Sequence, residues 1–173
     1  LWRFPDGVGL IDRAGGVIYK TKYAGFELTR SEKYFYTHLG GKKGLIDING
    51  NVLVECQFDK IFDPTEGLAI VVEDGKYGVY ALGEGLVVEP QYADIRPFDY
   101  GVAVFEDSST RLWGAMDKRG QVILEPRFYS GSNETGELYN MIVEKDNTFF
   151  PEFYNSKGEM VWSGEFLVER ARP

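Results

Sequence analysis

Two stretches of the sequence align without a gap over fifteen residues. GLIDINGNVLVECQF covers Gly44–Phe58, and GAMDKRGQVILEPRF covers Gly114–Phe128. Both begin with a glycine and an apolar pair, reach an aspartate, pass through a glycine-containing turn, and continue into three aliphatic residues and a glutamate. A glycine turn between two apolar runs is typical of a β-hairpin. The aligned stretches therefore predict a repeated β-structure.

Three further copies follow the same register. One begins at Gly9, one begins at Gly78, and a degenerate copy has Glu152 in place of the leading glycine. The leading positions 9, 44, 78, 114 and 152 are 35, 34, 36 and 38 residues apart. A period of about 36 residues is typical of stacked or radial repeat architectures. We therefore expect a single repeat domain over 1–173, with copies near 1–32, 33–67, 68–101, 102–137 and 138–173, the last one degenerate.

Each copy reads as three short strands. In one copy these are Val102–Phe105, Trp113–Met116 and Val122–Leu124, and the third is followed by Glu125-Pro126. Proline cannot donate to a β-ladder, so the strand is expected to stop there. No stretch shows convincing helical periodicity. The pattern predicts an all-β repeat protein of about five three-stranded meander units.

Packing between the copies leaves two arrangements. A meander this short cannot bury its own apolar face, so the repeats must cover one another. An open twisted β-repeat stack leaves two end repeats, whereas a small closed β-propeller removes most sheet edges. The terminal copies depart most from the pattern, which favours an open stack with capping ends. Five copies would also suit a ring, so the propeller stays the alternative.

Composition and charge weigh against several classes of function. The net charge is −8, whereas a protein that binds nucleic acid through phosphates needs a basic patch, so no nucleic-acid partner is expected. The apolar runs are only a few residues long, so this segment is not expected to insert into a membrane. The chain begins at Leu1 without methionine, which is expected of a mature or trimmed fragment of a soluble protein.

Catalytic and metal-binding residues are scarce. His38 and Cys56 are the single histidine and the single cysteine of the sequence. These counts exclude a zinc site built from several Cys or His ligands and a disulfide within the chain. Cys56 occupies the slot in which other copies have Pro90 and Pro126, which indicates a structural position at a strand end. We expect no cofactor, no metal site and no catalytic residues, so the chain is not predicted to be an enzyme.

The recurring aspartates Asp12, Asp47 and Asp117 could form a row of metal or acid–base ligands. Each of them begins a glycine-containing turn, however, and aspartate at such a position bonds its own backbone. A calcium loop would need a denser spacing of oxygen ligands than this sequence has. The recurrence therefore favours a structural role in the turns.

The copies resemble a known repeat family. Trp113-Gly114 is followed by Arg119-Gly120, by three aliphatic residues and by Glu125-Pro126. Tyr77-Gly78, Lys43-Gly44 and Val8-Gly9 are variants of the leading dipeptide. Phe62 with Gly67–Ala69, and Phe98 with Gly101–Ala103, match the later part. This pattern is similar to the bacterial WG repeat. The resemblance implies a repeat scaffold for binding partners, often exported or linked to the cell surface, and it supplies no ligand.

Aromatic residues that the repeat does not explain are the candidate binding residues. Tyr34-Phe35-Tyr36 and Phe149-Phe150 are more aromatic than their counterparts in other copies. Successive strand residues face opposite ways, so at least one ring of each run should face away from the core. Such rings stack on sugars or peptide side chains, or they cap the end of the stack against a neighbouring domain. The candidates are Tyr34, Tyr36, His38, Phe149 and Phe150.

Two functional hypotheses follow from the sequence. The first is a non-catalytic scaffold or interaction module that binds a protein partner and forms part of a bacterial exported or surface protein, periplasmic or at the cell surface. The compartment itself stays open, because one free cysteine suits either redox environment. The alternative is a carbohydrate-binding module or a glycosidase-like propeller, which predicts carboxylates converging with a Trp or Tyr in one cleft.

Overall fold

The computed structural model describes residues 2–4, 7–21, 23–135, 137–164 and 168–169. These residues form twenty β-strands. Within the described part of the chain, there is no helix with the length and apolar character needed to cross a membrane. The all-β class predicted from the repeat pattern is confirmed.

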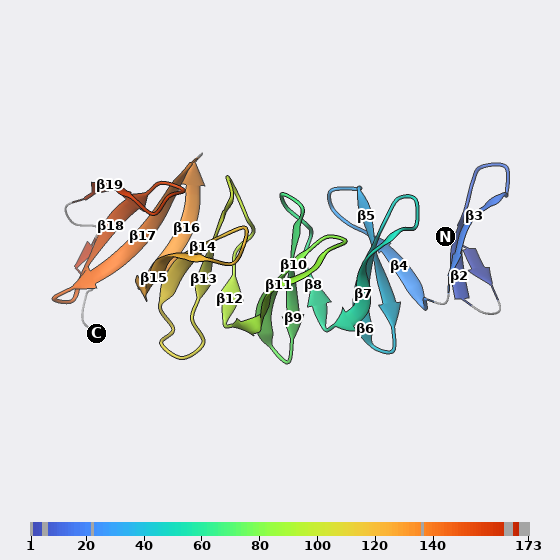
Figure 1. Cartoon of the computed structure of the whole chain (residues 1–173), viewed down its shortest axis with the longest axis horizontal. Helices are drawn as coiled ribbons and strands as arrows, with labels where there is room; N and C mark the ends of the chain where they lie inside the picture. The colour runs from blue at the N-terminus through green and yellow to red at the C-terminus, as the bar shows by residue number, and fades with distance from the viewer. Residues whose placement is uncertain (1, 5–6, 22, 136, 165–167, 170–173) are drawn as a thin grey trace.

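The strands form five antiparallel sheets that follow one another along the chain (Figure 1). In each sheet, sequence neighbours are also spatial neighbours, apart from one short strand that is added to the fifth sheet. The first sheet contains β1 (Trp2–Phe4), β2 (Gly7–Ile11) and β3 (Val17–Thr21). The second contains β4 (Gly25–Leu28), β5 (Tyr34–Leu39), β6 (Lys42–Asp47) and β7 (Val52–Phe58).

The third sheet contains β8 (Lys60–Ile61), β9 (Leu68–Glu73), β10 (Lys76–Ala81) and β11 (Gly85–Tyr92). The fourth contains β12 (Asp94–Ile95), β13 (Val102–Glu106), β14 (Trp113–Asp117) and β15 (Val122–Phe128). The fifth contains β16 (Ser130–Thr135), β17 (Leu138–Lys145), β18 (Thr148–Tyr154) and β19 (Met160–Ser163), with β20 (Val168–Glu169) paired to β18.

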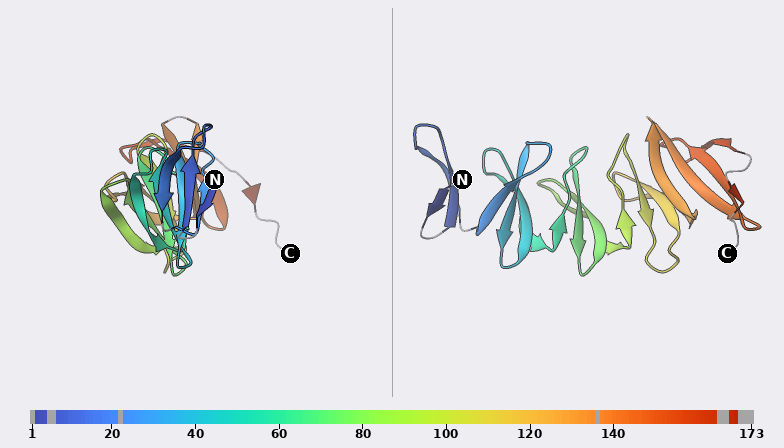
Figure 2. Two further views of the ribbon diagram at one scale, coloured as in Figure 1. Left: turned by 90° about the vertical axis from the view of Figure 1, so that its right-hand side faces the viewer. Right: turned by 180° about the vertical axis from the view of Figure 1, so that it is seen from behind.

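The five sheets form an open row. The first and the fifth sheets lie at opposite ends, as the views from the front and the back both show (Figures 1 and 2). A closed propeller would bring the first and last sheets together, so that alternative is wrong for this chain. The open twisted stack is confirmed. The division of residues 1–173 into one domain with five copies stays a prediction.

The central repeats have one strand more than the sequence pattern indicates. The sequence predicts three strands per copy, but the second, third and fourth sheets each have four. The extra strand comes from the connecting segment. In the third sheet, Lys60 pairs with Val72 and Ile61 with Val71, and Ile61 is buried. A strand of two residues is too short to produce a period in the sequence, so the pattern does not reveal it.

Side chains close the second turn of most copies. Oδ1 of Asp47 accepts hydrogen bonds from the backbone N–H groups of Asn49 and Asn51, both at 2.8 Å. Asp12 and Asp117 accept the equivalent pairs of bonds in their own turns. In the fifth copy Oδ1 of Asn155 does the same. The structural reading of the recurring aspartates is confirmed.

The backbone of the third strand passes directly beside the leading glycine of the repeat. A Cβ added to Gly114 would lie 2.5 Å from the carbonyl oxygen of Leu124. The same approach is 2.7 Å at Gly44 and 2.6 Å at Gly78. At each of these glycines the pairing of the second and third strands is irregular, which draws the third strand across the glycine. A side chain there would collide with backbone.

The fifth copy has room for a side chain at this position. Glu152 pairs directly with Ser163, and the next residue pairs in the same register. Its carboxylate is buried, and Oε2 accepts a 2.6 Å hydrogen bond from the Tyr154 hydroxyl and lies 3.5 Å from Arg127. Regular pairing thus replaces the irregular one, and a paired charge fills the space.

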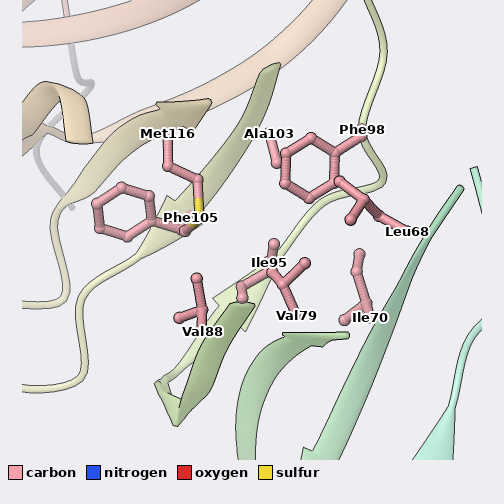
Figure 3. Packing of buried hydrophobic residues seen from close by; sticks show 9 residues of the cluster. All are labelled: Leu68, Ile70, Val79, Val88, Ile95, Phe98, Ala103, Phe105 and Met116. Atoms are coloured by element: carbon pink, nitrogen blue, oxygen red, sulfur yellow. The ribbon is translucent and has the colours of Figure 1, made fainter. Parts of the chain in front are cut away.

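The hydrophobic core lies between consecutive sheets. The cluster in Figure 3 joins Leu68, Ile70 and Val79 of the third sheet to Ala103, Phe105 and Met116 of the fourth. Two further clusters join the second sheet to the third and the fourth to the fifth. Among the described residues of the second to fifth sheets, the buried apolar side chains thus pack against a neighbouring sheet, as the short meanders require.

Turns also connect neighbouring sheets. The amide of Gly83, in the turn between β10 and β11, donates a hydrogen bond of 3.1 Å to the carbonyl of Leu53 in β7. In the next sheet, the turn glycine Gly120 lies so close to β11 that an added Cβ would be 2.5 Å from Cγ2 of Val88. Each of these second-hairpin turns therefore rests on the third strand of the preceding repeat.

Candidate functional site: a furrow across the repeats

Two hollows lie along one side of the stack. The first has a volume of about 530 Å³ and separates the second sheet from the third, and the second has a volume of about 520 Å³ and reaches the fourth and fifth sheets. Both are lined by Thr65 and Pro97, so they are adjacent, and we call the two hollows together the furrow. Their volumes lie in the range of ligand sites in proteins. The first hollow is lined by Glu27, Leu28, Arg30, Tyr36, Lys43, Ile61, Phe62, Asp63, Thr65 and Pro97; the second by Thr65, Arg96, Pro97, Phe98, Asp99, Gly131 and Ser132.

The furrow has the same construction in successive repeats. Glu27, Phe62 and Arg96 occupy one position in three consecutive copies, and all three are exposed. Phe62 stacks on Tyr77, with ring centroids 5.9 Å apart and planes 23° apart. The Arg96 guanidinium lies 5.1 Å from the centroid of the Trp113 ring. In both repeats, therefore, the aromatic ring before the repeat glycine packs against an exposed side chain of the furrow.

Tyr36 lines the first hollow from β5. Burial raises the pKa of its hydroxyl to about 12, and the charges of Asp63 and Glu27 act in the same direction, whereas Arg30 opposes them. The hydroxyl therefore keeps its proton at neutral pH and can donate a hydrogen bond. The ammonium of Lys43 lies 5.5 Å from the centroid of the Tyr36 ring.

The carboxylates of the first hollow are partly engaged with the neighbouring chain. Asp63 accepts hydrogen bonds from the Ser31 amide at 3.0 Å and the Ser31 hydroxyl at 3.3 Å, which ties the third sheet to the second. Oε2 of Glu27 lies 4.0 Å from Nε2 of His38. Two carboxylates and a tyrosine thus share this hollow, which is the constellation that the carbohydrate alternative predicts.

The five candidate residues from the sequence do not form one site. Tyr34, Tyr36 and His38 alternate along β5 and so share one face of that strand. Phe149 and Phe150 lie in β18 of the fifth sheet, at the far end of the row from β5 (Figure 1). Phe149 packs on Tyr129, with ring centroids 4.7 Å apart. Only Tyr36 lines the furrow, and the two aromatic runs are not brought together.

Sequence reasoning missed most of the furrow. Leu28, Arg30 and Phe62 lie in connecting segments, and the sequence singles out only Phe62, as part of the repeat pattern. One signal could have found it. Exposed side chains recur at positions 27, 62 and 96, one repeat apart, in segments where the core requires no large residue.

A separate acidic cluster outside the furrow is partly neutralised by a lysine of the chain itself. Oxygens of Asp59, Glu73 and Asp74 lie within 4.8 Å of one another. The ammonium of Lys42 is 2.7 Å from Asp59 and 2.5 Å from Glu73. These bonds raise the pKa of Lys42, and the bond from Lys42 lowers the pKa of Asp59. Lys42 comes from the second sheet, so the cluster links two repeats and has its own cation.

An open row of similar antiparallel sheets, with cores between the sheets and a furrow across them, defines a β-repeat module. Residues 44–77, 84–107 and 113–138 match the family model described as WG containing repeat. The chain belongs to this family. No curated protein matches the chain.

Proposed function

We propose that this chain is a non-catalytic scaffold that binds an extended segment of a partner protein in the furrow. The observation that carries the proposal is the adjacency of the two hollows, which share Thr65 and Pro97. A site that runs from the second sheet to the fifth suits a chain lying across the repeats better than it suits a compact small molecule. Extended concave surfaces of this kind are what stacked repeats offer to partners.

The exposed apolar side chains of the furrow support a protein partner. Leu28 is 49% exposed and Phe62 is 42% exposed, although both lie in a hollow. Aromatic side chains held in pockets contribute most of the binding energy in many protein interfaces. Asp63 is held by Ser31, which supports a structural rather than a catalytic role for this carboxylate. An exported or surface location in a bacterium is the part of the proposal that rests on the resemblance to the repeat family.

Selection from a random peptide library, followed by a matched pair of variants, tests this function. Peptides selected on the protein should bind with a Kd in the micromolar range, and Phe62→Ala should weaken binding about tenfold or more. Leu86→Ala is the control, because Leu86 is 39% exposed in the same sheet and lies outside the furrow. Equal losses in both variants, or selection of no saturable peptide, would contradict the proposal.

Carbohydrate binding is the second candidate function, because Tyr36, Glu27 and Asp63 share one hollow. Sugars bind to aromatic faces flanked by carboxylates and hydroxyl donors. A panel of soluble glycans, titrated against the protein and Phe62→Ala, separates the two functions. A glycan that binds saturably and is lost with Phe62, while library peptides fail, would replace the first function by the second.

A further inference from the structure

We infer that the furrow selects partner segments in which a carboxylate lies within about three residues of a large apolar side chain. This inference rests on the proposed function and names the chemistry of the partner. It follows from which charges of the first hollow are already engaged and which are not.

The cations of the first hollow lack carboxylate partners. Arg30 is exposed and Lys43 is half-buried, and within the described part of the chain neither makes an ion pair. The contact of Lys43 is with the face of Tyr36. Other cations on the surface of the stack are paired. Arg96 of the second hollow has a carboxylate within 4.0 Å, and so do Lys118 and Arg119, which lie outside the furrow.

The two carboxylates of the same hollow, Asp63 and Glu27, form no ion pair with Arg30 or Lys43 among the described residues. Asp63 uses both oxygens on Ser31, and the Glu27 side chain is 65% exposed and directed toward His38. Arg30 presents a planar guanidinium that matches a carboxylate in two-bond geometry, and charge-assisted bonds of this kind are stronger than neutral ones. Tyr36 adds a hydroxyl donor at the same place. Arg30, Lys43 and Tyr36 therefore form a receptor for an incoming carboxylate.

The apolar part of the hollow fixes the spacing in the ligand. A volume of about 530 Å³ corresponds to a space roughly 10 Å across. An extended chain rises about 3.3 Å per residue, so a segment crosses this space in about three residues. A carboxylate bound by Arg30 thus leaves a residue one to three positions away beside Phe62 and Leu28. The net charge of −8 repels acidic partners at long range, so the selection has to be local.

Three capped, fluorescein-labelled peptides test the inference by fluorescence anisotropy. The acidic probe has the sequence Gly-Ser-Asp-Leu-Asp-Phe-Ser, the second has Asn in place of both Asp residues, and the third has Lys there. We expect the acidic peptide to bind about tenfold more tightly than the Asn peptide, and the Lys peptide to bind most weakly. Arg30→Gln and, separately, Lys43→Met should reduce the preference for Asp over Asn to less than about threefold.

The control variant is Arg119→Gln, because Arg119 is exposed, lies outside the furrow and is paired with Asp117. It should keep the preference. Equal binding of the Asp and Asn peptides, tighter binding of the Lys peptide, or an undiminished preference in both Arg30→Gln and Lys43→Met would overturn the inference. Neutral library peptides that still bind and still depend on Phe62 would then leave the proposed function standing. Loss of Phe62 dependence for every peptide would remove the proposed function as well.

Discussion

Gly114 shows how one residue position defines the repeat. A Cβ at this position would lie 2.5 Å from the carbonyl oxygen of Leu124 and 3.1 Å from the nitrogen of Pro126. Backbone cannot move aside as a flexible side chain can, so Gly114→Ala should lower the free energy of unfolding by about 1–3 kcal/mol. Gly25→Ala is the control, because an added Cβ there has no atom within 4 Å. Denaturant titration measures both, and equal stability of the two variants would refute this account.

Asp107 provides a second prediction at the residue scale. Its Oδ1 accepts hydrogen bonds from the hydroxyls of Ser109 and Thr110, at 2.7 and 2.9 Å, and from both of their amides. These bonds lower the pKa of Asp107. A carboxyl group with a lowered pKa in the folded state stabilises the fold above its unfolded pKa of about 3.9, and this contribution is lost as the pH falls through the folded value.

Asp107→Ala should therefore destabilise the protein at pH 7, by up to about 1 kcal/mol because the loop is solvated. The difference between variant and wild type should shrink as the pH falls below about 3.9, the unfolded pKa. Urea denaturation at several pH values measures it. Asp107→Asn, which keeps one acceptor oxygen, should lose less stability at pH 7. A difference that is constant from pH 7 to pH 2 would show that the charge of Asp107 is not involved.

The sequence predicts some residue roles and not others, for a physical reason. The role of Asp47 in its turn follows from local spacing, because its hydrogen-bond partners lie two and four residues away. The role of Arg30 in the furrow depends on Phe62 and Pro97, which come from two other repeats. No local pattern contains that information, since the distance between repeats is decided by packing.

At the scale of elements, the turns between the second and third strands hold the repeats together. Gly120 and Gly15 occupy the same turn position, with φ of 75° and 85°, a region that strains any residue with a Cβ. Only Gly120 rests on a preceding strand, where the added Cβ would be 2.5 Å from Cγ2 of Val88, and at Gly15 no atom lies within 4 Å. Gly120→Ala should therefore cost about 1–3 kcal/mol more than Gly15→Ala.

Thermal or urea unfolding of the two alanine variants measures this difference. The backbone strain is common to both, so it cancels in the comparison. Equal losses of stability would mean that the contact between the Gly120 turn and β11 contributes nothing to the stack.

Strand existence was more predictable from the sequence than strand number. Apolar runs such as Leu68–Val72 predict the long strands β9 and β13, whereas β8 and β12 contain two residues each and leave no such run. These short strands form because Ile61 and Ile95 are buried between sheets, which leaves their backbone beside β9 and β13. Their pairing is thus a consequence of packing between repeats.

At the scale of the whole molecule, the buried side chains of the described residues form three separate clusters. The three clusters of buried side chains each join two neighbouring sheets, and Lys42 adds a charged link between the second and the third. Stability in such an array is the sum of repeat terms and nearest-neighbour terms. The open row and the absence of a shared centre could be anticipated from the degenerate terminal copies. The furrow could not, because each of its two hollows is lined by residues of three repeats.

Hydrogen exchange should reveal this nearest-neighbour organisation. Val71, Val79, Val104 and Ala115 in the third and fourth sheets are fully buried, because a repeat covers each side of them. Val17 of β3 is 56% exposed and Trp162 of β19 is 54% exposed, so the outer sheets lack that cover. Amides of β9, β10, β13 and β14 should therefore exchange at least about 100-fold more slowly than those of β3 and β19. Mass spectrometry of peptic fragments measures the gradient in the native protein. A common rate for all strands would show that the chain opens as one cooperative unit, which a stack held only by contacts between neighbours does not predict.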